Sequence, residues 1–374
     1  MKIAVLKEQA AGETRVALTP ETAKKFIALG AEVWVEAGAG ETAAIADSAY
    51  RDAGASVGPA AEVIKDAGIV LGVQAPDPAA LAGAKPGAKV AALFDPFRDG
   101  ARVEAYASAG YEALSMEFMP RITRAQSMDV LSSQSNLSGY KAVIAAADQY
   151  GRAFPMMMTA AGTVQAARVF IMGVGVAGLQ AIATAKRLGA QVSATDVRSA
   201  TREQIESLGA KAIFVAEGGI EGEGSGGYAS EMSDEYKAAQ AKLVSEHIAK
   251  QDIVITTALI PGRPAPRLVS DEQIASMKPG SVLFDLAVPQ GGNVEGAVAD
   301  ELVTRHGVTI MGYANTPAQL APDSSALFAR NLYNFLSAFW DGEAGEPVLD
   351  EEIGDAVRLT QGGQVVNARL KDAG

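Results

Sequence analysis

A glycine-rich turn followed by an acidic residue carries the clearest chemistry in this sequence. Gly173, Gly175 and Gly178 fit G-x-G-x-x-G and follow an apolar run typical of a buried strand. A helical pattern comes next, and then a second strand that ends at Asp196. In such a turn the first glycine permits the bend, the second lets the backbone approach a pyrophosphate, and the third lets helix and strand pack closely. The order of these parts predicts a dinucleotide site.

The groups beside this turn indicate which dinucleotide binds. The free N–H groups and the dipole at the start of the expected helix attract phosphates. Asp196 can accept hydrogen bonds from the adenosine ribose hydroxyls and would repel a 2′-phosphate, which favours NAD over NADP. Arg198 weakens this preference, because a nearby arginine can bind a 2′-phosphate.

A polar stretch at residues 120–136 is the second candidate for a binding site. It contains a cation, an amide, a carboxylate and a hydroxyl, carried by Arg121, Gln126, Asp129 and Ser132. Together these groups could hold a carboxamide-bearing ring. An ordinary loop network between two domains would have the same composition, and the residues alone leave both interpretations open.

The residues that usually move protons or bind metals are scarce. The only histidines, His247 and His306, stand in polar surroundings and are expected at the surface. The sequence has no cysteine and no metal-ligand cluster, so no metal is expected. A dehydrogenase that oxidises an alcohol or an amine must move a proton as well as a hydride, and no histidine is obviously placed to do so.

A segment rich in small residues, 217–232, contains Tyr228 and Met232 near its end. So many glycines raise the entropy cost of ordering the backbone. The segment is expected to be either a lid that closes over a ligand or a tolerated surface insertion.

The elements that must position these groups follow a repeating strand–helix pattern. Thr19, Pro20 and Thr22 predict a helix start, and Gly30 predicts its end. Apolar runs predict strands at 2–7, 32–36, 69–73, 89–93, 113–116, 169–172, 191–195, 212–215, 253–257, 282–286 and 308–311. Helical patterns are expected at 47–53, 78–82, 103–109, 136–150, 179–188, 205–208 and 320–340. The pattern predicts an α/β fold with parallel sheets.

The length of 374 residues favours two domains. The expected boundaries are 1–135 with 321–374 for a discontinuous N-terminal α/β domain, and 136–320 for an NAD(H)-binding Rossmann domain. The helix at 136–150 would cross into the second domain and the helix at 320–340 would return. We expect two Rossmann-like parallel-sheet domains with a nucleotide cleft between them.

Composition excludes several classes of function. Hydrophobic residues make up 48% and charged residues 20% of the chain, as in ordinary globular proteins. The net charge of −12 argues against nucleic acid as a partner. No run approaches the roughly 20 apolar residues of a membrane span, and the N-terminal apolar run is too short for a signal peptide.

Four long stretches, at 121–136, 154–163, 173–181 and 256–262, closely resemble the NAD(H)-binding α1 component (domain I) of proton-translocating nicotinamide nucleotide transhydrogenase. The resemblance covers nearly the whole chain. It implies a homodimer in complex with a membrane-spanning component and an NADP(H)-binding domain. It also implies a cytoplasmic protein that is peripheral on the inner membrane through that membrane partner. Hydride would pass directly between NADH and NADP⁺ on the partner domain, coupled to proton translocation.

The resemblance also implies roles for individual residues. Arg121, Gln126, Asp129 and Ser132 would position the nicotinamide. The pyrophosphate would lie at Gly175, Val176 and Ala177, and the adenosine ribose at Asp196, Val197 and Arg198. Further cofactor contacts are implied for Gly227, Tyr228, Gln240 and Leu259. Direct hydride transfer between two nicotinamides needs alignment rather than a local acid or base, which suits a chain poor in histidine.

The alternative is an NAD-dependent amino-acid dehydrogenase similar to alanine dehydrogenase, to which the transhydrogenase family is related. Arg15 could then bind a substrate carboxylate. That enzyme's lysine, histidine and aspartate should fall where Gln74, Phe94 and Pro289 stand here. A non-catalytic NAD sensor would keep the glycine turn but would have no need for the polar stretch at 121–132.

Overall fold

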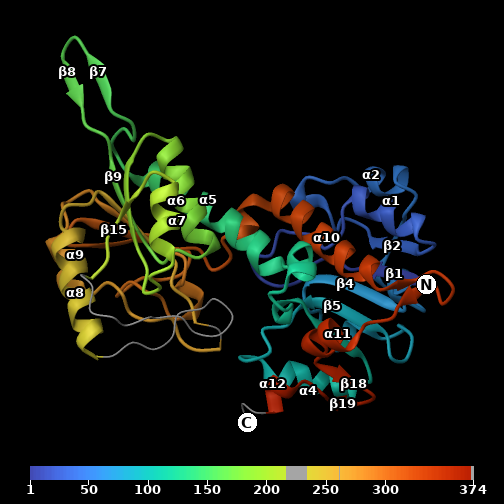
Figure 1. Cartoon of the computed structure of the whole chain (residues 1–374). Coiled ribbons are helices and arrows are strands. Elements are labelled where there is room, and N and C mark those ends of the chain that lie inside the picture. The colour runs from blue at the N-terminus through green and yellow to red at the C-terminus, as the bar shows by residue number, and fades with distance from the viewer. Residues whose placement is uncertain (216–233, 261, 372–374) are drawn as a thin grey trace. The chain divides into compact units, whose positions relative to one another are not determined.

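The computed structural model describes residues 1–215, 234–260 and 262–371. The chain forms two compact units, Met1–Gln134 with Ala318–Gly374 and Ser135–Pro317, each built on its own sheet (Figure 1). One sheet has six parallel strands and the other has seven strands that are mostly parallel. The predicted α/β class with two parallel-sheet domains is confirmed.

The sheet of the first unit has the order β3-β2-β1-β4-β5-β6, with every pair parallel. This is the doubly wound order, in which the strand order reverses between β1 and β4. The strands are β1 (Lys2–Val5), β2 (Glu32–Glu36), β3 (Ser56–Gly58), β4 (Ile69–Gln74), β5 (Lys89–Leu93) and β6 (Glu112–Ser115).

Helices cover both faces of this sheet. Alternate strand residues point to opposite faces, so Ile3 packs with Phe26 and Phe328 in one core while Ala4 packs with Phe94 and Tyr106 in another. Thr19 and Thr22 form the capping box of α1, as expected. The helices are α1 (Pro20–Ala28), η1 (Glu41–Ala43), α2 (Asp47–Asp52), α3 (Ala60–Ile64), η2 (Pro78–Leu81), α4 (Gly100–Ser108), η3 (Met116–Phe118), η4 (Thr123–Met128), α10 (Ala321–Ala338), α11 (Glu351–Val357) and α12 (Ala368–Lys371). Two short hairpins follow α10 in the chain, β16 (Trp340–Asp341) with β17 (Glu346–Pro347) and β18 (Thr360–Gln361) with β19 (Gln364–Val365).

The sheet of the second unit has the order β11-β10-β9-β12-β13-β15-β14, and its strand order reverses between β9 and β12. The strands are β9 (Arg168–Met172), β10 (Gln191–Thr195), β11 (Lys211–Ala212), β12 (Ile253–Thr256), β13 (Val282–Asp285), β14 (Val303–Arg305) and β15 (Val308–Met311). The helices are α6 (Val176–Arg187), α7 (Thr201–Ser207), α8 (Asp234–Ile248), α9 (Asp271–Ser276) and η6 (Val288–Gln290). Helix α5 (Val130–Gln149) begins in the first unit and ends in the second, and η7 (Pro317–Leu320) lies where the chain returns.

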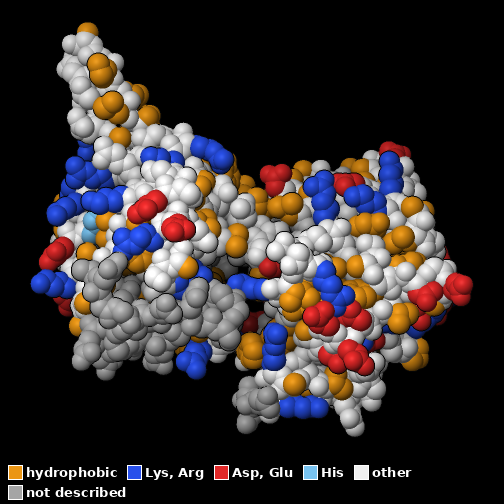
Figure 2. Space-filling model, viewed as in Figure 1, with side chains coloured by type: hydrophobic (Ala, Val, Ile, Leu, Met, Phe, Trp, Pro, Cys, Tyr) orange, Lys and Arg blue, Asp and Glu red, His pale blue; other side chains and the backbone are white. Residues whose placement is uncertain are grey.

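Three features differ from the expectations. The polar stretch before residue 136 is helical rather than a loop, because η4 is followed at once by α5, whose first turn is capped by Asp129. The second sheet has an antiparallel edge strand, β14. A β-hairpin, β7 (Met157–Thr159) with β8 (Gly162–Val164), projects from the second unit (Figures 1 and 2).

The hairpin exposes three consecutive methionines, Met156, Met157 and Met158, whose exposed fractions are 60%, 43% and 80%. Figure 2 shows hydrophobic side chains on this projecting hairpin. Over the residues that the structure describes, no helix has both the length and the apolar character to span a bilayer.

Candidate functional site

The glycine turn of the second unit has the shape that the sequence predicts. Gly173 has a φ of 98°, and a Cβ there would lie 2.6 Å from the Thr257 hydroxyl. A Cβ on Gly178 would lie 2.0 Å from the Gly173 carbonyl oxygen, so α6 packs directly on the turn. A Cβ on Gly175 would meet no protein atom within 4 Å. Two glycines are therefore required by the fold, and Gly175 faces open space that a ligand can approach.

This turn leads directly into the start of α6. Gly175 is the N-cap residue, and no side chain caps the helix. The first N–H groups of a helix lack intrahelical acceptors and attract anions. Val176 is 38% exposed and Ala177 is half-buried, so the first turn is accessible. The residues present therefore fit a pyrophosphate.

Asp196 lies at the end of β10, beside the glycine turn. Its carboxylate accepts a hydrogen bond from the Val174 N–H at 2.7 Å. The guanidinium of Arg198 donates to both carboxylate oxygens, from Nε at 2.9 Å and from Nη2 at 3.0 Å. Asp196 thus connects the turn to Arg198, with the half-buried Val197 between them in the sequence. Because Arg198 compensates the charge of Asp196, repulsion of a 2′-phosphate is weaker than the acidic residue alone suggests.

The other predicted contacts in the second unit are less well defined. Gln240 is half-buried on α8, and Leu259 is 36% exposed in the turn after β12. Gly227, Tyr228 and the segment 217–232, expected to be a lid or an insertion, lie outside the described residues.

Sequence reasoning missed several residues that shape this site. A Cβ on Gly139 of α5 would lie 2.0 Å from the Ala177 carbonyl oxygen, so only glycine lets α5 approach the start of α6. A glycine inside a helical pattern was the available signal. Asn293, which is fully buried, accepts from the Ala258 N–H and donates to the carbonyls of Ala258 and Pro266. It fixes the turn after β12, and nothing local in the sequence marks it.

The first unit brings the other four predicted residues together. Pro120, Arg121, Gln126, Asp129 and Ser132 line one pocket of about 210 Å³. The carboxylate of Asp129 accepts from the Ser132 N–H at 2.9 Å and from its hydroxyl at 2.5 Å. Asp129 therefore caps α5 and holds Ser132 at the same time. The pocket is smaller than the roughly 300–1,000 Å³ of drug-sized ligand sites, which suits a single ring.

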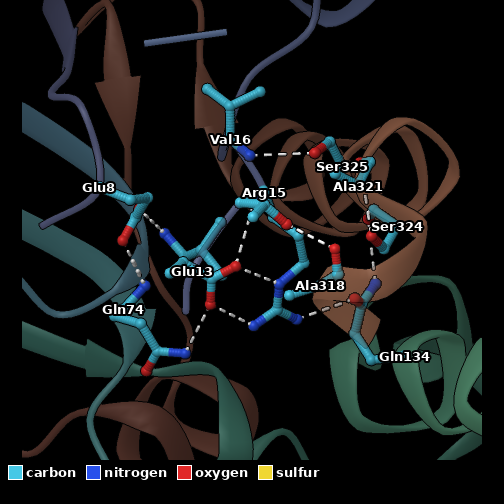
Figure 3. A network of polar contacts seen from close by, with 12 residues as sticks. Glu8, Glu13, Arg15, Val16, Gln74, Gln134, Ala318, Ala321, Ser324 and Ser325 are labelled. Atoms are coloured by element: carbon cyan, nitrogen blue, oxygen red, sulfur yellow. Dashed lines mark hydrogen bonds and ion pairs between the residues drawn. The ribbon is translucent and has the colours of Figure 1, made fainter. Parts of the chain in front are cut away.

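A buried ion pair, Arg15 with Glu13, contacts helix α5 through Gln134 (Figure 3). Arg15 and Glu13 have exposed side-chain fractions of 3% and 0%, and two guanidinium nitrogens donate to Glu13 at 2.6 and 2.7 Å. A third nitrogen donates to Gln134 of α5 at 2.9 Å. Burial acts to raise the pKa of Glu13, but the hydrogen bonds and the charge of Arg15 hold that pKa below its usual value. Arg15 thus joins its own loop to the first turns of α5.

Two further glutamates of the first unit, both half-buried, bind backbone N–H groups at the carboxyl ends of strands. Glu8, which follows β1, accepts from the Val73 and Gln74 N–H groups at the end of β4. Burial raises the pKa of Glu8 to about 7. Glu117 accepts from the Phe94 and Asp95 N–H groups after β5, and burial raises its pKa as well.

These contacts lie at the positions where the alanine-dehydrogenase interpretation requires acid–base groups. The Gln74 side chain donates to Glu13 at 3.0 Å (Figure 3), and Phe94 is buried in the core. Pro289 lies within η6. Within the first unit, Gln74 therefore serves a side-chain hydrogen bond and Phe94 serves packing.

The two histidines have different surroundings. His306 is exposed, as predicted, and pairs with Asp271 at 2.9 Å. The prediction for His247 is wrong, because its ring is half-buried against Phe170 with centroids 4.7 Å apart, and Nε2 lies 2.8 Å from the Ser193 hydroxyl. Burial lowers the pKa of His247. The polar neighbours of His247 in the sequence gave no sign that α8 turns this residue toward the sheet.

Comparison with known proteins identifies the family of the chain. The family model described as "Alanine dehydrogenase/PNT, N-terminal domain" matches residues 4–138, and the corresponding C-terminal domain matches residues 142–368. The L-alanine dehydrogenase structure, at 24% identity and a TM-score of 0.81 over 100% of this chain and 99% of that one, shares the fold.

Transhydrogenase subunits are more similar in sequence. The first part of NAD(P) transhydrogenase subunit alpha from Rhodospirillum rubrum is 50% identical over 100% of both chains. Alanine dehydrogenase of Halomonas elongata is 29% identical over 94% of this chain and 91% of its own length. The crystal structure of transhydrogenase from Sinorhizobium meliloti matches at 53% identity and a TM-score of 0.89, covering 98% of this chain and 100% of that one. The chain therefore belongs to the alanine dehydrogenase/PNT family and, within it, to the subunits of NAD(P) transhydrogenase, which are oxidoreductases.

Proposed function

We propose that this chain is the NAD(H)-binding component of a proton-translocating transhydrogenase. The observation that carries the proposal is the pocket of the first unit, which is lined by a cation, an amide, a carboxylate and a hydroxyl. These groups suit the carboxamide of a nicotinamide. When bound, NAD(H) supplies or accepts the hydride, and the chain's own residues hold and align the ring.

Each unit has its own set of proposed contacts with the cofactor. Gly175, Val176 and Ala177 bind the pyrophosphate through backbone N–H groups, because the turn is open at Gly175. Asp196 accepts from the adenosine ribose while Arg198 limits the charge that the ribose meets. In the first unit Arg121 and Gln126 hold the carboxamide, and the Asp129–Ser132 pair fixes the ring's orientation.

The second nucleotide, NADP(H), belongs to a partner domain, and a membrane-spanning component couples the transfer to proton translocation. The subunit names of the relatives imply a complex of several chains. We propose a homodimer that is cytoplasmic and peripheral on the inner membrane through this partner. The absence of a histidine from the pocket lining fits direct transfer, which needs two nicotinamide carbons at about 3–3.5 Å rather than an acid or base.

The test is an assay of the purified chain with NADH and an NADP⁺ analogue, with and without the isolated NADP(H)-binding domain of a known transhydrogenase. Hydride transfer that requires the added domain supports the proposal. Alanine with NAD⁺ is the second arm, and turnover there would instead establish an amino-acid dehydrogenase.

A substitution in the pocket sharpens the test. Gln126→Asn shortens the amide that lines the pocket, so hydride transfer should fall by roughly 10- to 100-fold while NADH affinity changes little. Stopped-flow rates and titration of NADH binding measure the two quantities. Equal losses in both would show that Gln126 captures the ring rather than positions it.

A further inference from the structure

We propose that Asn331 is a positioning residue for hydride transfer, acting on the pocket residues through the backbone that carries them. The inference rests on the proposed function of the pocket. Asn331 lies on α10, far from the pocket residues in sequence, and is only 7% exposed.

One side chain holds the pocket segment on both sides of Asp129. The Nδ2 of Asn331 donates to the Ser127 carbonyl oxygen at 2.8 Å. Its Oδ1 accepts from the Ser133 hydroxyl at 2.7 Å. The stretch from Ser127 to Ser133 carries two pocket side chains, Asp129 and Ser132, and it directly follows a third, Gln126. The amide of Asn331 joins the two ends of this stretch.

An amide is the group that this geometry requires, because it donates and accepts in fixed directions from one planar head. A carboxylate would retain the bond from Ser133 but would turn an oxygen toward the Ser127 carbonyl. An apolar side chain would lose both contacts, because it offers neither a donor nor an acceptor. The contact therefore specifies where Ser127 and Ser133 lie relative to α10.

Further hydrogen bonds hold residues 127–134 against α10. Gln134, next to Ser133, donates to the Ser324 carbonyl on α10 at 3.1 Å and accepts from Arg15 (Figure 3). Asn334, one turn after Asn331, also donates to the Ser127 carbonyl, at 3.0 Å, but it is less buried and its amide does not hold Ser133. Asn334 is thus a matched control on the same helix with the same acceptor.

The experiment compares Asn331→Ala, Ser133→Ala and Asn334→Ala in the full chain. Three quantities are measured: the NADH dissociation constant, the single-turnover hydride-transfer rate at saturating NADH with an added NADP(H)-binding domain, and the melting temperature. Asn331→Ala should lower the rate by roughly 10- to 100-fold with less than about a threefold change in NADH affinity. Ser133→Ala should lower it less, and Asn334→Ala should stay within about twofold of the wild type.

A double variant tests whether the two residues act together. If Ser133 and Asn331 form one clamp, Ser133→Ala with Asn331→Ala should be no slower than Asn331→Ala alone. A wild-type rate in Asn331→Ala, or a rate loss matched by lost NADH affinity, would overturn the inference. If Asn331→Ala does not fold, Ser133→Ala decides: a lower rate at unchanged affinity supports the clamp and an unchanged rate refutes it. Failure of the wild-type chain to transfer hydride would instead overturn the proposed function, on which the inference about Asn331 rests.

Discussion

The two units have closely related sheets but use the carboxyl ends of their central strands in opposite ways. In the first unit Glu8 lies at the reversal of strand order and accepts the backbone N–H groups that end β4. In the second unit the same position holds the glycine turn, and Gly175 faces open space. Open α/β sheets bind ligands at this reversal. The same sheet topology therefore serves two purposes. Where the backbone N–H groups stay accessible it can bind a ligand, and where a side chain such as Glu8 accepts from them it forms a packed scaffold.

The largest effect is expected from breaking the buried pair of the first unit. Glu13→Ala leaves the guanidinium of Arg15 buried without its carboxylate, which should lower the free energy of unfolding by about 3–5 kcal/mol. Chemical denaturation measures this loss. Glu21→Ala is the control, because Glu21 pairs with Arg330 at the surface and should cost under about 1 kcal/mol. Equal losses in the two variants would mean that burial does not distinguish the pairs.

Glu8→Gln tests whether the Glu8 carboxylate, at the reversal of strand order in the first sheet, makes the stability of the protein depend on pH. Burial raises the pKa of Glu8 from 4.5 to about 7 in the folded state, so wild-type stability should fall as pH rises through this interval. Glutamine does not ionise, so the variant lacks this loss. The variant's unfolding free energy minus that of the wild type should rise by about 3 kcal/mol between pH 4.5 and pH 8. A difference that does not change with pH would contradict the assignment.

Gly175→Ala tests whether the open glycine turn after β9 in the second sheet binds the cofactor. The new methyl group meets no protein atom, so the melting temperature should hold while NADH affinity falls by roughly 10- to 100-fold, about 1.4–2.7 kcal/mol. Gly178→Ala is the matched variant, since its Cβ would collide with the Gly173 carbonyl and lower stability as well. Calorimetric titration with NADH and thermal unfolding separate the two effects. Full NADH affinity in Gly175→Ala would place the ligand elsewhere.

Asp196→Ala should have the smallest of these effects. It removes an acceptor for the ribose and releases Arg198, so NADH binding should weaken roughly tenfold, about 1.4 kcal/mol, and the preference for NADH over NADPH should shrink. Parallel titrations with the two nucleotides measure both changes. Unaltered affinity for both would remove Asp196 from the site.

Sequence patterns predicted those parts of the fold that depend on local signals. The bounds of β2, β5, β10 and β15 follow directly from apolar runs, and α1 follows from its capping residues. The early start of α5 was missed because its cap, Asp129, lies in a polar stretch that resembles a loop.

Most of the features that the sequence did not predict depend on tertiary contacts. No local pattern marks the surroundings of Glu8 or Glu13. Glu8 accepts from Val73 and Gln74, which are 65 and 66 residues away, and Glu13 forms a buried pair with Arg15. The pocket residues could be named from the motif, whereas Asn331 could not, because its partners are about 200 residues away in sequence. Burial of polar groups depends on partners that local composition does not reveal.

The hairpin of β7 and β8 has a consequence for oxidative chemistry. The chain has no cysteine, so its oxidisable sulfur is carried by methionine. Met116 and Met128 are buried, whereas Met156, Met157 and Met158 are open to solvent. Among the methionines that the structure describes, peroxide should therefore convert those of the hairpin to sulfoxides first, because oxidation follows accessibility. The result would be a polar hairpin on an otherwise intact protein, and methionine sulfoxide reductases could reverse it.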